Sequence, residues 1–156
     1  MSGARNDPWN LQRFVDAQQG VHEQALAELR AGRKRTHWIW FELPQLAALG
    51  RSGWARHYGL QGLAEAVAYW THPVLGPRLE ACVRALNAHP QAAPEAMLGP
   101  VDAIKFRSCA TLFAQVAGPR SAFGEALAIF WGGRGDEATL ALIGPGEGAA
   151  CAGDAG

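Results

Sequence analysis

The spacing of apolar residues along the chain predicts a fold built from α-helices. Between residues 7 and 143, apolar side chains recur three and four positions apart, which places them on one face of a helix. The clearest such stripe consists of Leu75, Leu79, Cys82 and Leu86. No segment of useful length alternates apolar and polar residues as a half-buried strand does. We therefore predict an all-α fold, a single compact domain over residues 7–143 with about seven to eight short-to-medium helices.

Residues with capping side chains mark where several of these helices begin. Asp7 precedes Pro8, and an acceptor followed by proline is typical of a helix start, so the first helix is expected there. The other expected caps are Ser52, Ser121 and Asp136. The most apolar helix runs from about Val101 to Ala117, between two Gly-Pro pairs. Outside the domain, residues 1–6 and the Gly/Ala-rich residues 144–156 offer little to a core, and we expect both termini to be flexible.

Composition and charge narrow the class of protein. The chain has 156 residues, of which 49% are hydrophobic and 18% charged, so it is globular rather than disordered. Its net charge of zero argues against nucleic-acid binding, which needs a broad basic surface. Cys82, Cys109 and Cys151 form no CxxC pair and therefore indicate neither a disulfide framework nor a structural zinc site, and we expect no bound metal. With no signal peptide and no apolar run of about 18 residues, we expect a cytoplasmic monomer without membrane contact and without a cofactor.

An unusually aromatic stretch covers residues 33–45. It runs from Arg33-Lys34-Arg35 into His37-Trp38-Ile39-Trp40-Phe41 and closes on Pro44-Gln45. One interpretation makes Trp38 and Trp40 core anchors, His37 a core histidine bonded to backbone, and the basic run a solvated helix end. The other places four candidate substrate-binding residues around a planar ligand such as a base or a nicotinamide: His37, Trp38, Trp40 and Gln45. In that case the basic run is placed to contact phosphate groups.

The helix expected from Val101 carries polar residues on its apolar side. At about 100° per residue, Asp102 and Lys105 fall inside the arc of apolar side chains, and Ser108 falls at its edge. Asp102 and Lys105 either pair with each other, with the lysine stem along the core, or line a partly buried pocket. In a pocket they are candidate catalytic residues, acting as acid, base or anion contact, and Ser108 is a candidate substrate-binding residue.

Several segments of the sequence resemble one bacterial protein family. They are residues 7–18, residues 29–41 with the His-Trp-x-Trp-Phe block, Pro44-Gln45, residues 72–79 and residues 105–113. The family is uncharacterised: it is known only as a domain of unknown function, and its members are sometimes mislabelled calpastatin. The resemblance implies a compact, mostly helical single domain without an established activity. Glu42 and Cys109 depart from it, standing where an apolar residue and a serine are expected, and Cys109 weakens any proposal of a hydroxyl nucleophile there.

The sequence leaves several functions open, and it does not decide whether the protein is an enzyme. The first hypothesis is a protein that binds a nucleotide or ribosyl-type small molecule in an aromatic-lined pocket. The alternative is a structural or protein-interaction module without catalytic activity, whose polar groups only specify packing. A third, N-glycoside or ADP-ribose-type hydrolysis, rests on a loose architectural analogy to the small helical NADAR proteins, which carries over no residues. Nucleic-acid binding through residues 33–35 is the weakest, given the neutral net charge.

Overall fold

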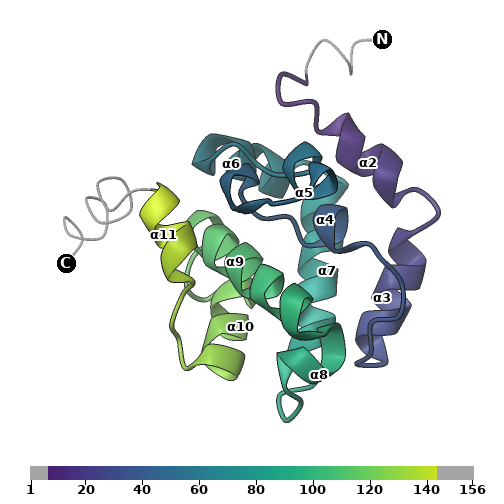
Figure 1. Cartoon of the computed structure of the whole chain (residues 1–156), viewed down its shortest axis with the longest axis vertical. Coiled ribbons are helices and arrows are strands. Elements are labelled where there is room, and N and C mark those ends of the chain that lie inside the picture. Colours follow the sequence, from purple (N-terminus) through teal and green to yellow (C-terminus); the bar gives the residue numbers. More distant parts are fainter. Residues whose placement is uncertain (1–6, 144–156) are drawn as a thin grey trace.

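Two long helices, α7 (Leu75–Asn87) and α9 (Pro100–Ala117), form the centre of the structure (Figure 1). The computed structural model describes residues 7–143, so the expectations for residues 1–6 and 144–156 lie outside the described residues. Every residue of the apolar stripe predicted for α7 is buried. The all-α prediction is therefore confirmed, and the central helix has the inward face that periodicity assigned to it.

Ten α-helices and one 3₁₀ turn form within residues 7–143. Apart from α7 and α9 they are α2 (Gln12–Gln18), α3 (His22–Arg30), α4 (Ile39–Glu42), η1 (Ala47–Leu49), α5 (Gly53–His57), α6 (Leu63–Thr71), α8 (Pro94–Leu98), α10 (Ala122–Trp131) and α11 (Glu137–Ile143). The helices that periodicity did not anticipate are α4 and α8. With four and five residues, they are too short to repeat a helical period.

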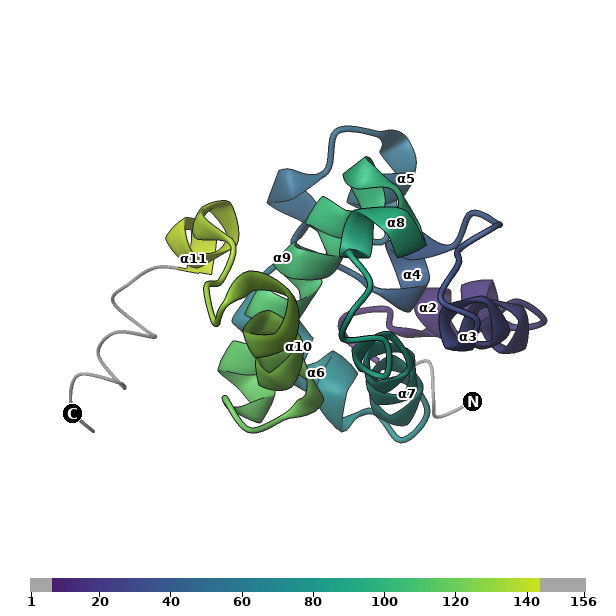
Figure 2. The same cartoon turned by 90° about the horizontal axis from the view of Figure 1, so that it is seen from below.

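Most of the remaining helices pack against one or both of these two long helices. α7 packs against α3, α6 and α10, while α9 packs against α6, α8, α10 and α11. Figure 2 looks nearly along α7, with α3 on one side and α10 on the other. Within residues 7–143, no helix is long and apolar enough to cross a membrane.

Helix caps were the most local of the sequence predictions, and three of them are confirmed. The Ser52 hydroxyl accepts the Ala55 N–H at 3.1 Å, the Ser121 hydroxyl accepts the Gly124 N–H at 3.4 Å, and the Asp136 carboxylate accepts the Thr139 N–H at 2.9 Å. These bonds begin α5, α10 and α11. Each satisfies a backbone donor that the first helical turn leaves free.

The predicted start of the first helix at Pro8 is wrong, although Asp7 does act at that end. Its carboxylate oxygens accept the N–H groups of Leu11 and Gln12 at 2.7 and 2.9 Å. The helix begins only at Gln12, because the chain first turns through Asn10, whose φ of 54° lies in the left-handed region.

Arg13 ties α2 to the segment before α6. Its guanidinium contacts the Glu65 carboxylate at 3.0 Å and also donates to the backbone carbonyls of Trp9, Asn10, His57 and Gly59. Glu65 is buried, and its second oxygen accepts the Gln61 N–H at 2.8 Å. A buried carboxylate thus obtains both a charged and a neutral donor.

The short helix α4 is held by side chains of other helices. The Phe41 carbonyl accepts hydrogen bonds from the Gln18 amide of α2 at 2.7 Å and from the Tyr69 hydroxyl of α6 at 3.2 Å. Burial raises the pKa of Tyr69 well above its usual range, so the phenol keeps the proton that it donates. The position of α4 is therefore fixed by tertiary contacts.

Candidate functional site

A buried carboxylate fixes the first half of the aromatic stretch. Glu28 of α3 accepts the backbone N–H of Arg35 and of Thr36, and the Trp38 indole N–H, at 2.8, 3.1 and 2.9 Å. It also accepts the Thr36 hydroxyl at 2.7 Å and the Gln24 amide at 2.9 Å. The loop after α3 is thus bound to α3 by one side chain, which is only 4% exposed.

These bonds predict a loss of stability in acid. Burial on its own raises the pKa of Glu28, but the donors of Arg35, Gln24, Thr36 and Trp38 outweigh it and lower the pKa to about 2, from an ordinary value of 4.5. A carboxyl with a depressed folded pKa stabilises the protein above its unfolded pKa, and this contribution disappears as pH falls from about 4.5 to about 2. We expect the free energy of unfolding to fall by up to about 3 kcal/mol from this group.

Chemical denaturation across this pH range measures the effect. Glu28→Gln, which cannot ionise, should lack this part of the acid dependence. If the free energy of unfolding falls equally with pH in the wild type and in Glu28→Gln, other carboxyl groups cause the acid dependence.

Two of the candidate binding residues, Trp38 and His37, do not line the pocket that Gln45, Lys105 and Ser108 share. Trp38 is fully buried and its indole N–H is used by Glu28, which agrees with its interpretation as a core anchor. His37 is exposed, so it is not the core histidine that was the alternative expectation. The planar floor expected from His37 and both tryptophans is therefore not assembled.

Trp40 connects the aromatic stretch to α9. The Lys105 ammonium lies 5.6 Å from the Trp40 ring centroid, a distance typical of a cation–π contact. On another side, the exposed Trp54 ring lies 5.9 Å from it and is tilted. The Trp40 indole N–H is buried and, within the described residues, has no hydrogen-bond partner. The two segments singled out in the sequence thus meet at Trp40 and Lys105.

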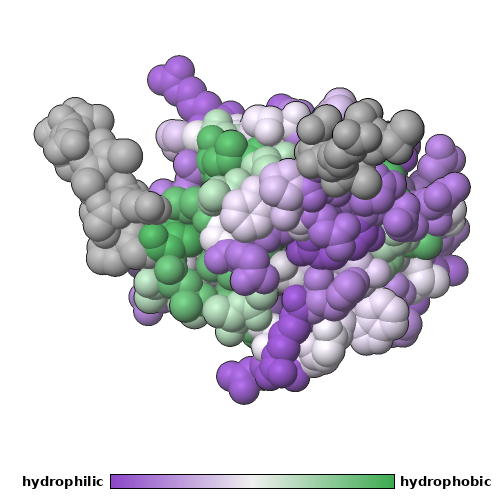
Figure 3. Space-filling view, turned by 90° about the horizontal axis from the view of Figure 1, so that it is seen from above, coloured by the Kyte–Doolittle hydropathy of each residue, from purple (hydrophilic) through white to green (hydrophobic). Residues whose placement is uncertain are grey.

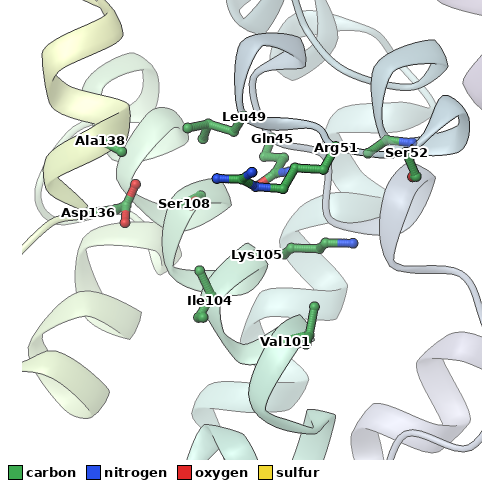
Figure 4. A pocket seen from close by; sticks show the side chains of 11 residues that line it. Gln45, Leu49, Arg51, Ser52, Val101, Ile104, Lys105, Ser108, Asp136 and Ala138 are labelled. Atoms are coloured by element: carbon green, nitrogen blue, oxygen red, sulfur yellow. Dashed lines mark hydrogen bonds between the residues drawn. The ribbon is translucent and has the colours of Figure 1, made fainter.

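Beside this contact, a pocket of about 420 Å³ opens between the η1–α5 region and α9 (Figure 4). Gln45, Lys105 and Ser108, all candidate residues from the sequence, line it together. Its other lining residues are Leu49, Arg51, Ser52, Ala55, Val101, Ile104, Asp136 and Ala138. Trp40 is not among them, so the walls are aliphatic rather than aromatic.

The polar groups of the pocket are largely without partners. Across residues 7–143, neither Arg51 nor Lys105 forms an ion pair, and the Gln45 and Ser108 side chains form no hydrogen bond. In Figure 4 the Arg51 side chain extends across the pocket toward Ser108 and Asp136, whereas Lys105 extends in the opposite direction. Arg51 is not among the binding residues predicted from the sequence. Its only signal is a cation between Gly50 and Gly53 in a short loop after the aromatic stretch.

The expected pair between Asp102 and Lys105 does not form. The Asp102 carboxylate instead contacts the Lys34 ammonium at 2.9 Å. Lys34 reaches α9 because its own N–H donates to the Met97 carbonyl at 2.7 Å, which holds the loop after α3 against α8. Lys34 is therefore half-buried rather than part of a solvated helix end. Asp102 does not line the pocket, and among the described residues it forms no ion pair with Lys105, the other candidate catalytic residue.

Comparison with known proteins places the chain in a family. The family described as "Protein of unknown function (DUF1810)" matches residues 8–143. The chain belongs to this family. The crystal structure of the conserved hypothetical protein Rv1873 from Mycobacterium tuberculosis is similar, with 45% sequence identity and a TM-score of 0.85 over 88% of this chain and 98% of that chain. No curated protein matches. The family resemblance found in the sequence is confirmed, and neither description states an activity.

The residues that depart from the family resemblance are both buried. Cys109 of α9 is fully buried, and burial raises the pKa of its thiol far above the usual range, so it packs as a small apolar residue. Glu42, at the end of α4, is only 1% exposed. A carboxylate in this position needs partners, whereas the thiol does not.

Proposed function

We propose that this protein binds a small organic anion of the nucleotide or phosphorylated riboside class in the pocket between η1–α5 and α9. The observation that carries the proposal is that four polar side chains around one pocket form no ion pair and no hydrogen bond within residues 7–143, Lys105 contacting only the face of Trp40. Arg51 and Lys105 supply two cations, while Gln45 and Ser108 supply neutral donors and acceptors. Asp136 is the acidic residue among the lining groups, and its carboxylate is already bonded to Thr139.

The size and walls of the pocket suit such a ligand. Pockets for small organic molecules span roughly 300–1,000 Å³, with mostly apolar walls and a few polar groups that orient the ligand. Here the pocket measures about 420 Å³, and Leu49, Val101 and Ile104 offer an apolar surface to a flat base or a ribose. A guanidinium can bind phosphate through two parallel hydrogen bonds, and an ammonium adds a point charge.

Binding rather than catalysis is the proposal. Asp102 and Lys105 are the residues that could assist hydrolysis of an N-glycoside, but the Asp102 carboxylate is bonded to Lys34 and does not line the pocket. Lys105 alone could hold an anion without taking part in a proton transfer. Hydrolysis of a riboside by this protein therefore has less support than binding.

A protein-interaction module is the second candidate function, favoured by exposed apolar side chains. Val101 and Ile104 of α9 are 64% and 63% exposed, and Leu140 and Leu142 of α11 are also exposed. Figure 3 shows apolar surface gathered on the side of α11, with hydrophilic residues over much of the rest of that face. Such a patch commonly marks a contact surface. This alternative expects no small anion to stabilise the protein.

The binding proposal is tested by thermal-shift screening with nucleotides, ADP-ribose, ribose phosphates and inorganic phosphate. We expect at least one organic phosphate to raise the melting temperature, and phosphate alone to act weakly because it leaves the apolar wall uncovered. Arg51→Ala and Lys105→Met should each weaken binding of that compound about tenfold or more, as for a lost hydrogen bond to a charged group.

Arg120→Ala is the matched control, since Arg120 is an exposed arginine that does not line the pocket. It should bind as the wild type does. A screen without any stabilising compound, or equal affinities in the wild type, Arg51→Ala and Lys105→Met, would overturn the proposal.

A further inference from the structure

A second cluster of chemically active side chains lies where three helices meet, and none of its members lines the pocket. His22 begins α3, Glu42 ends α4 and Cys82 lies in the middle of α7. The His22 Nδ1 atom is 2.7 Å from Glu42 Oε1, and the Cys82 sulfur is 3.6 Å from the same oxygen. One donor atom from each residue lies within 4.8 Å of the other two.

The second oxygen of Glu42 has no partner. Glu42 Oε2 is buried and, within residues 7–143, accepts no hydrogen bond. A carboxylate oxygen in the interior without a donor is costly, and native proteins seldom retain one. His22 and Cys82 both contact Oε1 and therefore provide no donor for Oε2. A positively charged partner for the carboxylate would account for it.

We propose that His22, Glu42 and Cys82 form a binding site for a divalent transition-metal ion, with Zn²⁺ as the ion that fits best. Imidazole nitrogen, carboxylate oxygen and thiolate sulfur are the ligands that Zn²⁺ uses in proteins, whereas Mg²⁺ and Ca²⁺ take oxygen ligands only. Two anionic ligands and one neutral imidazole give a neutral complex with Zn²⁺. Neutrality matters because Glu42 and Cys82 are buried.

The two distances to Glu42 Oε1 require little adjustment, and the third, between the His22 and Cys82 donor atoms, lies within 4.8 Å. Zinc bonds of about 2.0–2.3 Å in a tetrahedral site place neighbouring ligand atoms roughly 3.3–3.6 Å apart. The distance between the Cys82 sulfur and Glu42 Oε1 is already 3.6 Å. The His22–Glu42 distance of 2.7 Å is that of a hydrogen bond and must open by roughly 0.6 Å.

The site also has a route of entry and an open coordination position. The His22 side chain is 12% exposed, while that of Glu42 is 1% exposed, so an ion reaches the cluster past the imidazole. On binding, the Cys82 thiol releases its proton to solvent as the bond between sulfur and metal forms, and a neutral His22 imidazole binds through Nδ1 with its proton on Nε2. Three protein ligands leave a fourth position, which a water molecule or Glu42 Oε2 can fill.

Metal titration of the untagged protein tests the proposal, with Cys151→Ser in every sample because that thiol lies outside the described residues. We expect one Zn²⁺ per chain in equilibrium dialysis. Co²⁺ in its place should give a thiolate-to-metal charge-transfer band in the near ultraviolet and the intense visible bands of a four-coordinate ion. Cys82→Ser should abolish the charge-transfer band, and Glu42→Gln should weaken Zn²⁺ binding at least tenfold.

Two matched controls separate this site from the other thiols and imidazoles. Cys109→Ser changes a buried cysteine outside the cluster, and His57→Gln changes an exposed histidine. Both should keep the band and the affinity. A band that survives Cys82→Ser but disappears in Cys109→Ser, or the absence of stoichiometric binding, overturns the proposal.

A measurement on the unsubstituted cluster remains decisive if a core variant fails to fold. X-ray absorption at the zinc edge should show one sulfur at about 2.3 Å and nitrogen or oxygen ligands at about 2.0–2.1 Å. A first shell without sulfur, or with two sulfurs, contradicts the assigned ligands. None of these readouts depends on the pocket, so either proposal can fail without the other.

Discussion

Replacing Glu28 by alanine is expected to lower the free energy of unfolding by about 3–5 kcal/mol. The change removes the acceptor for the Trp38 indole and for the N–H groups of Arg35 and Thr36. Trp38 is fully buried, so water cannot replace the lost acceptor for its indole. Urea denaturation at pH 7, followed by tryptophan fluorescence, measures the loss.

The matched control is Glu23→Ala, because Glu23 is an exposed glutamate on the same helix. Its loss should not exceed about 1 kcal/mol, the size of a helix-dipole contribution. Glu28→Gln keeps a carbonyl acceptor and should fall between the two. Equal losses in Glu28→Ala and Glu23→Ala would mean that the bonds to the loop contribute little to stability.

Replacing Arg13 by methionine is expected to cost about 3–5 kcal/mol, because it leaves the buried Glu65 carboxylate without its charged partner. The Gln61 N–H is then the remaining donor to Glu65. The guanidinium is also lost as a hydrogen-bond donor to four backbone carbonyls, those of Trp9, Asn10, His57 and Gly59. Thermal and urea denaturation should both report the loss.

A second substitution distinguishes the effect of the unpaired Glu65 charge from the effect of the packing lost with Arg13. Adding Glu65→Gln to Arg13→Met removes the buried negative charge, so the double variant should be more stable than Arg13→Met alone. The exposed pair Arg84–Glu80 is the control, and Arg84→Ala should cost no more than about 1 kcal/mol. A double variant no more stable than Arg13→Met would show that the charge is not the cause.

Local rules explain what the sequence could predict of the fold. The stripe on α7 and the Ser52 cap depend on residues within one or two turns, so their outcome is visible in the sequence. The same rules favoured pairing Asp102 with Lys105, the nearest cation on its helix. The actual partner, Lys34, comes from a loop whose path depends on the bond to Met97. The ion pair between Lys34 and Asp102 depends on a tertiary contact, which the spacing of residues along one helix cannot reveal.

The candidate site was predictable from the sequence only in part. The sequence marks Lys105 as a polar residue inside an apolar arc, Ser108 as one at the edge of that arc, and Gln45 as the end of the aromatic stretch. Arg51 lies in a loop, where no periodicity marks a side chain as facing inward or outward. Glu28 looked like an ordinary polar residue of α3, because its donors become visible only once the following loop is folded back.

The short helix α4 has a consequence for the order of folding. Four residues cannot sustain a helix alone, because a single turn does not repay the cost of nucleation. The Phe41 carbonyl is held by Gln18 and Tyr69, which lie on helices before and after it in the chain. We infer that α4 acquires its shape only when α2 and α6 have docked. Gln45 lies three residues after the end of α4, so the position of this pocket residue depends on the docking of α2 and α6.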